Sequence, residues 1–202
     1  SDLQGVFCSM FQIAWKSHPI EWLHAIIHPT PKCNGDFRPI SLLSQLSKIL
    51  EKIMASRLEK ECFHNSIISP RQFGCQRGSN VQDALMLLQH YASTSNYLCV
   101  FFSDISKAYD TTNPAILVEK MIDKGFPPNM CYWVKEFLTM RSFQVRFQGE
   151  LSSVRFPSFG LAQGSPLSVI LWKLFFDPPH SEMDLIYMDD LAFVVQAPSR
   201  RQ

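Results

Sequence analysis

Three aspartates in this sequence of 202 residues directly follow short apolar runs, where a charged side chain needs a reason. Asp104 follows Val100-Phe101-Phe102-Ser103, and Asp189 and Asp190 follow Ile186-Tyr187-Met188. If the two runs are neighbouring strands of one sheet, their ends bring together carboxylates that repel one another unless a divalent cation neutralises them. Two Mg²⁺ ions roughly 3.5–4 Å apart suit in-line displacement at phosphorus. The pattern therefore predicts a magnesium site for nucleotidyl transfer.

The same residue types also fit a structural interpretation. Asp is common in turns, so the pair Asp189 and Asp190 alone is typical of a solvated hairpin turn. We assign Asp110, six residues after Asp104, to a capping role in the turn before Asn113. The metal site therefore depends on Asp104, Asp189 and Asp190 lying at one edge of a sheet.

Apolar periodicity predicts the elements that must position these side chains. Apolar residues three and four apart predict helices over 45–63, 81–88, 114–122, 129–140 and 166–176. Short runs rich in β-forming residues predict strands over 97–102, 142–148, 152–159, 185–188 and 191–195. The last two strands form a hairpin around the Asp pair, and the second and third form another. Because helices and strands are mixed without strict alternation, we expect an α+β fold.

Composition excludes several classes of protein. A hydrophobic content of 46% excludes a disordered chain, and a net charge of +1 gives no sign of a nucleic-acid partner, which must be argued from local sites. No apolar run approaches the roughly 18 residues of a membrane span, so we expect no membrane partner. Six cysteines without a CxxC pair fit reduced thiols. We expect an intracellular location, in the cytoplasm, the nucleus or both.

Five ordered blocks of sequence resemble the reverse transcriptases of non-LTR retrotransposons of the LINE-like, jockey type. The blocks FSDISKAYD, QGSPLS and YMDD, at residues 102–110, 163–168 and 187–190, resemble motifs A, B and C of that family. The blocks FRPISL and QFGCQRGS, at 37–42 and 72–79, resemble its fingers motifs. Five blocks in the family's order are far more specific than a single Asp pair.

The resemblance implies an α+β right-hand polymerase fold. It places the fingers at residues 1–96 and 114–159 and the palm at 97–113 and 160–202. Because the sequence stops soon after motif C, we expect an incomplete palm, a missing thumb and a piece of a longer polypeptide. Asp189 follows Gln163 by 26 positions, fewer than the family usually has, and Pro178-Pro179 interrupts where the helix of motif B would continue.

The resemblance also assigns the catalytic residues. Asp104, Asp189 and Asp190 would hold two Mg²⁺ ions, with Mn²⁺ as an alternative, which agrees with the argument from strand ends. Tyr109 would lie under the sugar of the incoming nucleotide and exclude a 2′-hydroxyl, although a core tyrosine fits the same position.

The remaining implied contacts are with nucleotide and template. Lys32 and Arg38, on either side of a predicted hairpin turn, would hold the triphosphate, although solvated basic residues are also common at such a turn. Gln163 and Gly164 would contact the nucleotide, with Gly allowing close approach of the backbone. Two further basic residues would contact template phosphates: Arg71 and Arg77.

The function expected from the resemblance is RNA-directed DNA synthesis, with an RNA template, a DNA primer and dNTPs as partners. One alternative is a catalytically inactive remnant of a retrotransposon, or a fragment that only binds nucleic acid. A second is an RNA-dependent RNA polymerase, which Tyr109 opposes because its ring would meet the 2′-hydroxyl of a ribonucleotide. The sequence indicates no oligomeric state.

Overall fold

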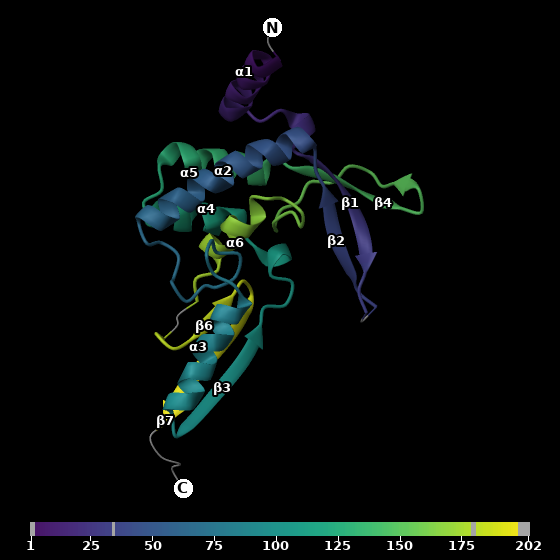
Figure 1. Ribbon diagram of the computed structural model, residues 1–202. Helices are drawn as coiled ribbons and strands as arrows, with labels where there is room; N and C mark the ends of the chain where they lie inside the picture. Colours follow the sequence, from purple (N-terminus) through teal and green to yellow (C-terminus); the bar gives the residue numbers. More distant parts are fainter. Residues whose placement is uncertain (1–2, 34, 179–180, 198–202) are drawn as a thin grey trace. The chain divides into compact units, whose positions relative to one another are not determined.

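The computed structural model describes residues 3–33, 35–178 and 181–197, which divide into two compact units (Figure 1). Unit 1 comprises Ser1–Asn65 and Tyr109–Phe175, and unit 2 comprises Ser66–Ala108 and Phe176–Gln202. Each unit contains a β-sheet and at least one α-helix, so the predicted α+β class is confirmed. The boundaries of the units differ from those of the expected fingers and palm, a division that stays a prediction.

The sheet of unit 1 has the strand order β2-β1-β4-β5. β1 (His24–Pro31) pairs antiparallel with β2 (Phe37–Leu42) and parallel with β4 (Ser142–Phe147). Only the first half of β1 pairs with β4, so its two prolines, Pro29 and Pro31, fall where β1 has β2 as its one partner in the sheet. Proline is tolerated there because no donor is needed on that side of the strand. The predicted hairpin around residues 33–36 is confirmed.

The predicted strand over 152–159 is wrong. β5 covers only Glu150–Leu151, and beyond it Arg155 meets Phe143 in a single isolated bridge. At the break, the hydroxyl of Ser152 accepts the N–H of Val145 at 2.9 Å, so a side chain replaces the backbone acceptor that would continue the ladder. Pro157 then supplies no N–H, which disfavours any further pairing.

In its described residues, unit 1 contains five α-helices: α1 (Leu3–Lys16), α2 (Gln45–His64), α4 (Pro114–Asp123), α5 (Pro128–Thr139) and α6 (Ser168–Phe175). The core is formed by fully buried side chains such as Met54, Leu117, Val134 and Leu171. α4 begins as predicted, because the side chain of Asn113 accepts the N–H groups of the first turn. α6 starts two residues later than predicted and is short.

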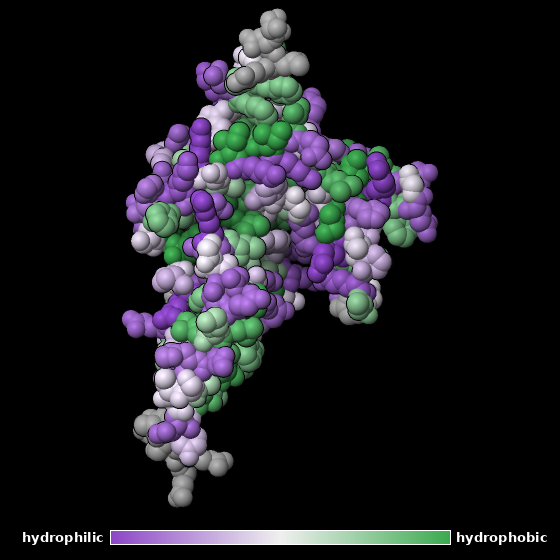
Figure 2. Space-filling model, viewed as in Figure 1, coloured by the Kyte–Doolittle hydropathy of each residue, from purple (hydrophilic) through white to green (hydrophobic). Residues whose placement is uncertain are grey.

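The sequence did not predict α1, which buries little of its surface. Its best-packed residues are Ala14, which is fully buried, and Trp15, whose ring stacks on Trp133 at 5.7 Å and lies under the guanidinium of Arg57 at 4.1 Å. An apolar groove between α1 and α2 is lined by Phe11, Trp15 and Ile53 among others, and Figure 2 shows hydrophobic side chains gathered at this place. No helix in the described part of the chain is both long and apolar enough to span a membrane.

Unit 2 is built on a three-stranded antiparallel sheet in the order β3-β7-β6. β3 covers Tyr97–Asp104, β6 covers Leu185–Tyr187 and β7 covers Asp190–Ala197. The helix α3 (Val81–Thr94) begins with a reciprocal capping box between Asn80 and Asp83, and its Tyr91 carbonyl accepts the Nε2–H of Gln196 on β7. The predicted hairpin is confirmed, but the expected position of both aspartates at its tip is wrong: the two-residue turn is Met188 and Asp189, and Asp190 is already the first residue of β7.

Candidate active site

The pairing of β3 with β7 brings two of the three predicted carboxylates side by side. Asp104 is the last residue of β3, Asp190 is the first residue of β7, and the two are direct partners in the antiparallel register. Directly opposed residues have Cα atoms about 4.5–5.5 Å apart and side chains on the same face of the sheet. Asp189 precedes Asp190 in the turn that joins β6 to β7. The three aspartates therefore lie at the same end of this sheet, where β3 finishes and β7 begins.

The negative charges of these three aspartates repel one another. The pKa of Asp190 is raised above its ordinary value, first by partial burial and then by the negative charges of Asp189 and Asp104. In the described part of the chain, no three side chains of His, Cys, Asp or Glu are arranged closely enough to hold a metal ion. The donor chemistry nevertheless fits Mg²⁺, which prefers carboxylate oxygens.

The turn that carries Asp189 is held by a side chain that the sequence did not single out. Gln72 is buried, and its Oε1 accepts the backbone N–H of Met188 and that of Gly74, both at 2.9 Å. Met188 has a φ of 60°, in the left-handed region that few L residues adopt. The only signal for this contact in the sequence was the position of Gln72 at the start of the QFGCQRGS block.

In unit 1, the predicted nucleotide contacts Gln163 and Gly164 lie against β2. The N–H of Ser41 donates to the carbonyl of Gln163 at 2.7 Å. Gly164 has a φ of 116°, and a Cβ on it would lie 2.8 Å from the carbonyl oxygen of Ser41. Glycine is required here both by the backbone conformation and by the close approach. The resemblance implied that the backbone of Gly164 closely approaches a nucleotide. In the structure, the backbone that it closely approaches is that of Ser41 on β2.

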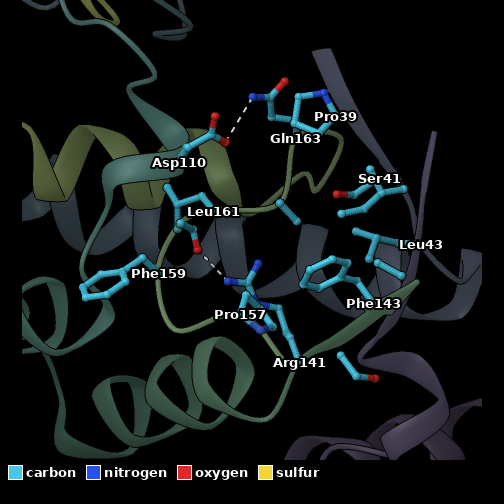
Figure 3. Close-up of a pocket in the computed structure, with 15 residues that line it drawn as sticks. Pro39, Ser41, Leu43, Asp110, Arg141, Phe143, Pro157, Phe159, Leu161 and Gln163 are labelled. Carbon is cyan, nitrogen blue, oxygen red and sulfur yellow. Dashed lines mark hydrogen bonds between the residues drawn. The ribbon is translucent and has the colours of Figure 1, made fainter. Parts of the chain in front are cut away.

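The structure places Asp110 beside Gln163, and the capping role expected of Asp110 stays a prediction. Asn113 itself caps α4, and Asp110 lies in a short 3₁₀ turn (Tyr109–Thr111), where its carboxylate receives a long hydrogen bond of 3.5 Å from Nε2 of Gln163. Figure 3 shows these two side chains directed at one another. They lie at a cavity of about 200 Å³ whose walls come from β1, β2 and residues 157–163.

Buried polar groups anchor the loop that contains Gln163 and Gly164. The carboxylate of Glu51, on α2, is almost fully buried and accepts the hydroxyls of Ser47, at 2.7 Å, and of Ser165. The guanidinium of Arg141 is also buried, and its Nη2 donates to the carbonyl of Gly160 at 2.6 Å. Burial lowers the pKa of Arg141 to about 10, and the charge of Glu51 opposes that shift. Sequence reasoning did not single out either residue, because the contacts that hold this loop join Glu51 to Ser165, 114 positions away, and Arg141 to Gly160, 19 positions away.

Lys32 and Arg38 are exposed and flank the turn of the β1–β2 hairpin, which is closed by a hydrogen bond of 2.7 Å from the Lys32 N–H to the Asp36 carbonyl. Tyr109 is half-buried, with its ring edge-on to Trp172 at 5.9 Å. These residues belong to unit 1.

The two predicted template contacts lie in unit 2 and differ in exposure. Arg77 is exposed. Arg71 is half-buried, and its Nη1 donates to the hydroxyl of Tyr91 at 3.1 Å. An arginine already bonded within its own unit has fewer donors left for a phosphate.

Curated relatives are similar to this chain in sequence. It is 31% identical over 205 residues to the RNA-directed DNA polymerase from mobile element jockey of Drosophila melanogaster, and the match covers 94% of this chain and 22% of that protein. It is 30% identical over 199 residues to a probable RNA-directed DNA polymerase from transposon BS of the same species, covering 91% of this chain and 22% of that protein. The chain thus spans about a fifth of the length of these relatives.

Solved telomerase structures have a similar fold. Telomerase of Candida tropicalis in complex with the TWJ fragment of telomeric RNA superimposes with a TM-score of 0.63 at 13% identity, covering 88% of this chain and 36% of that one. The apo enzyme truncated from its C-terminal domain gives a TM-score of 0.62 at 13% identity, covering 86% and 44%. The model of the reverse transcriptase (RNA-dependent DNA polymerase) family matches residues 30–202. Most of the sequence is therefore accounted for by one family, and the chain belongs to the reverse transcriptases.

Proposed function

We propose that this chain is the catalytic part of an RNA-directed DNA polymerase of a non-LTR retrotransposon, which extends a DNA primer on an RNA template. The observation that carries the proposal is the register that pairs Asp104 with Asp190 and places Asp189 in the adjoining turn. Three neighbouring carboxylates repel one another and so destabilise the fold. Such a cluster is therefore expected at a functional site and not where the strands have only a structural role. Relatives of the same family support the assignment.

The proposed reaction is a single in-line displacement. The primer 3′-hydroxyl gives up its proton to water, and its oxygen attacks the α-phosphorus of a dNTP. The bond from that phosphorus to the bridging oxygen of the β-phosphate breaks, and pyrophosphate leaves. Lys32 and Arg38 would hold the triphosphate, Arg through its planar fork and Lys as a compact charge. Gln163 and Gly164 would contact the nucleotide, and Arg71 and Arg77 the template phosphates.

Members of this family generally use divalent metal ions. Asp104, Asp189 and Asp190 would hold two Mg²⁺ ions here, or Mn²⁺ in their place, and the ions would neutralise charge that develops on the phosphate oxygens. The role of the protein itself is to present the three carboxylates from a rigid sheet edge. We also propose that the protein works inside the cell, in the cytoplasm, the nucleus or both, which the absence of disulfides among the described residues supports.

Primer extension on an RNA template with dNTPs and Mg²⁺ tests the proposal. The chain is compared with an Asp189→Asn, Asp190→Asn double variant and with Asp123→Asn, which makes the same change at an exposed site at the end of α4. We expect extension by the wild-type chain and by Asp123→Asn and none by the double variant. No extension by any of the three would support the alternative of an inactive or purely binding remnant.

The choice between DNA and RNA synthesis depends on Tyr109. A Tyr109→Ala variant should incorporate ribonucleotides more readily, because removal of the ring leaves room for a 2′-hydroxyl. If the variant leaves the preference unchanged, the assigned role of Tyr109 is wrong. If the wild-type chain itself prefers ribonucleotides, the alternative of an RNA-dependent RNA polymerase gains support.

A further inference from the structure

We propose that Gln72 is a positioning residue that holds the turn Met188-Asp189 and thereby fixes the direction of the Asp189 carboxylate. The inference rests on the proposed function, in which Asp189 is a metal ligand. Gln72 touches neither substrate nor metal in this scheme and acts only through the backbone of Met188. All the residues involved belong to unit 2.

The segment that contains Gln72 is attached to β6 through an isolated β-bridge. The N–H of Ile186, in the middle of β6, donates to the carbonyl of Arg71 at 2.9 Å, and the N–H of Phe73 donates to the carbonyl of Ile186 at 2.8 Å. Gln72 and Ile186 form a parallel bridge between these two bonds. The backbone of residues 71–73 is therefore fixed against β6, two residues before the turn begins.

The side chain of Gln72 continues this attachment into the turn. Only 4% of Gln72 is exposed, and its single amide oxygen accepts the N–H groups of Met188 and Gly74 at 2.9 Å each. Met188 is itself only 8% exposed, so its N–H has little access to water as a substitute acceptor. A buried backbone N–H without a partner is strongly disfavoured. The turn is thus bound to an oxygen supplied 116 residues earlier in the sequence.

Two further features show that this contact is tight. Met188 has a φ of 60°, a conformation that its Cβ disfavours and that the bond to Gln72 helps to hold. Gly74 lies so close that a Cβ on it would be 2.5 Å from the Met188 nitrogen and 2.7 Å from the Met188 Cγ. Any larger residue at position 74 would push the turn away from Gln72.

The consequence for the site follows from the length of the turn. Tyr187 and Asp190 are paired across the hairpin, so only Met188 and Asp189 connect the two strands. Because Tyr187 and Asp190 are held in their strands, the backbone torsions of Met188 determine the direction in which the Cβ of Asp189 points. Groups that orient metal ligands typically change metal affinity or activity by about 10- to 100-fold when they are removed.

The test compares three variants in the full chain. Gln72→Met keeps the length of the side chain but loses the strong acceptor, Gln72→Glu keeps an acceptor oxygen, and Gln89→Met makes the first change at an exposed position on α3. Hydrogen exchange of the Met188 amide, resolved by NMR, reports the contact without any need for activity. Binding of Mn²⁺ alone, followed by its electron paramagnetic resonance signal, reports the metal site.

We expect Gln72→Met to raise the exchange rate of the Met188 amide about tenfold and to weaken Mn²⁺ binding about tenfold, with exchange in the middle of β3 unchanged. Gln72→Glu should restore slow exchange, and Gln89→Met should behave as wild type. In primer extension, Gln72→Met should lower kcat with little change in the KM for dNTP, since the nucleotide contacts lie elsewhere.

Wild-type exchange at Met188 in folded Gln72→Met would overturn the inference, as would unchanged Mn²⁺ affinity. Should Gln72→Met fail to fold, Gly74→Ala provides the second variant, because it displaces the turn while leaving Gln72 in place, and it should weaken Mn²⁺ binding in the same way. A wild-type chain that binds no Mn²⁺ would count against the proposed function, whereas the exchange of Met188 would still decide the role of Gln72.

Discussion

Replacement of Glu51 by Leu should destabilise the protein although the substitution adds an apolar side chain to a buried position. Glu51 is 1% exposed, and its carboxylate accepts hydroxyl groups of Ser47 and Ser165. It also provides negative charge that favours the buried guanidinium of Arg141. A leucine removes both acceptors and leaves that guanidinium without its opposing charge.

The magnitude follows from these contacts. A hydrogen bond to a charged group contributes about 1.5–3 kcal/mol, and removal of one member of a buried charge pair costs about 3–5 kcal/mol. Because the two serine hydroxyls can rotate towards other acceptors, and no direct bond joins Glu51 to Arg141, we expect a loss of about 3 kcal/mol for Glu51→Leu. Glu51→Gln keeps one acceptor oxygen and should cost about half of that.

Urea unfolding followed by tryptophan fluorescence measures these losses, because the chain contains four tryptophans. For a protein of this size, about 3 kcal/mol corresponds to a Tm lower by about 6–12 °C. Glu59, exposed on the same helix, provides the matched control, and Glu59→Leu should change stability by less than about 0.5 kcal/mol. Buried ion networks can be replaced by apolar residues without loss in some proteins. Equal or greater stability of Glu51→Leu would show that this is such a case and would refute the reasoning.

Three further predictions concern single side chains. Asp190→Asn should abolish primer extension yet raise the free energy of unfolding without added metal by about 0.5–1 kcal/mol at pH 7 and low salt, because it removes repulsion from two neighbouring aspartates. Since the folded-state pKa of Asp190 is raised, wild type regains this stability as the pH falls through that pKa, and calorimetry should find the difference reduced near pH 4 and absent well below the ordinary aspartate pKa of about 3.9. Asn113→Ala should lower the unfolding free energy in urea by about 1 kcal/mol, because it removes the N-cap of α4, and an unchanged midpoint would contradict that role. Burial raises the pKa of Cys62 to about 12, so in peptide mapping after alkylation at pH 8 the native protein should be labelled at exposed Cys8 and not at Cys62.

The parts of the fold that sequence reasoning predicted are those determined by local signals. The helix at α4 begins where Asn113 and Pro114 predicted it, because an N-cap and a first-turn proline act within four residues. The hairpin at Asp189 and Asp190 was predicted from two apolar runs separated by a short polar turn. The position of Asp104 beside that hairpin was also predicted, because neighbouring strands of one sheet bring their ends close together.

What the sequence could not predict depends on contacts between distant residues. Gln72 bonds to Met188, 116 positions away in the sequence, and Glu51 bonds to Ser165, 114 positions away. Neither apolar periodicity nor motif spacing predicts contacts between residues so far apart in the sequence. The strand predicted after Leu151 failed because Ser152 bonds the backbone through its side chain, a choice that apolar alternation does not reveal. α1 is a different case, because its apolar residues recur three and four apart and the same signal that predicted the other helices was present but was not used.

The register of β3 and β7 has a consequence for which mutations this fold tolerates. Side chains alternate between the two faces of a strand, so the loss or gain of one residue between Tyr97 and Ser103 would turn either Asp104 or the whole preceding strand to the opposite face. A substitution such as Val100→Ile alters one contact, whereas a single-codon deletion in the same strand would either separate Asp104 from Asp190 or exchange the two faces of the residues before Asp104. The length of β3 should therefore be as strictly preserved in active copies as the identity of the aspartate at its end.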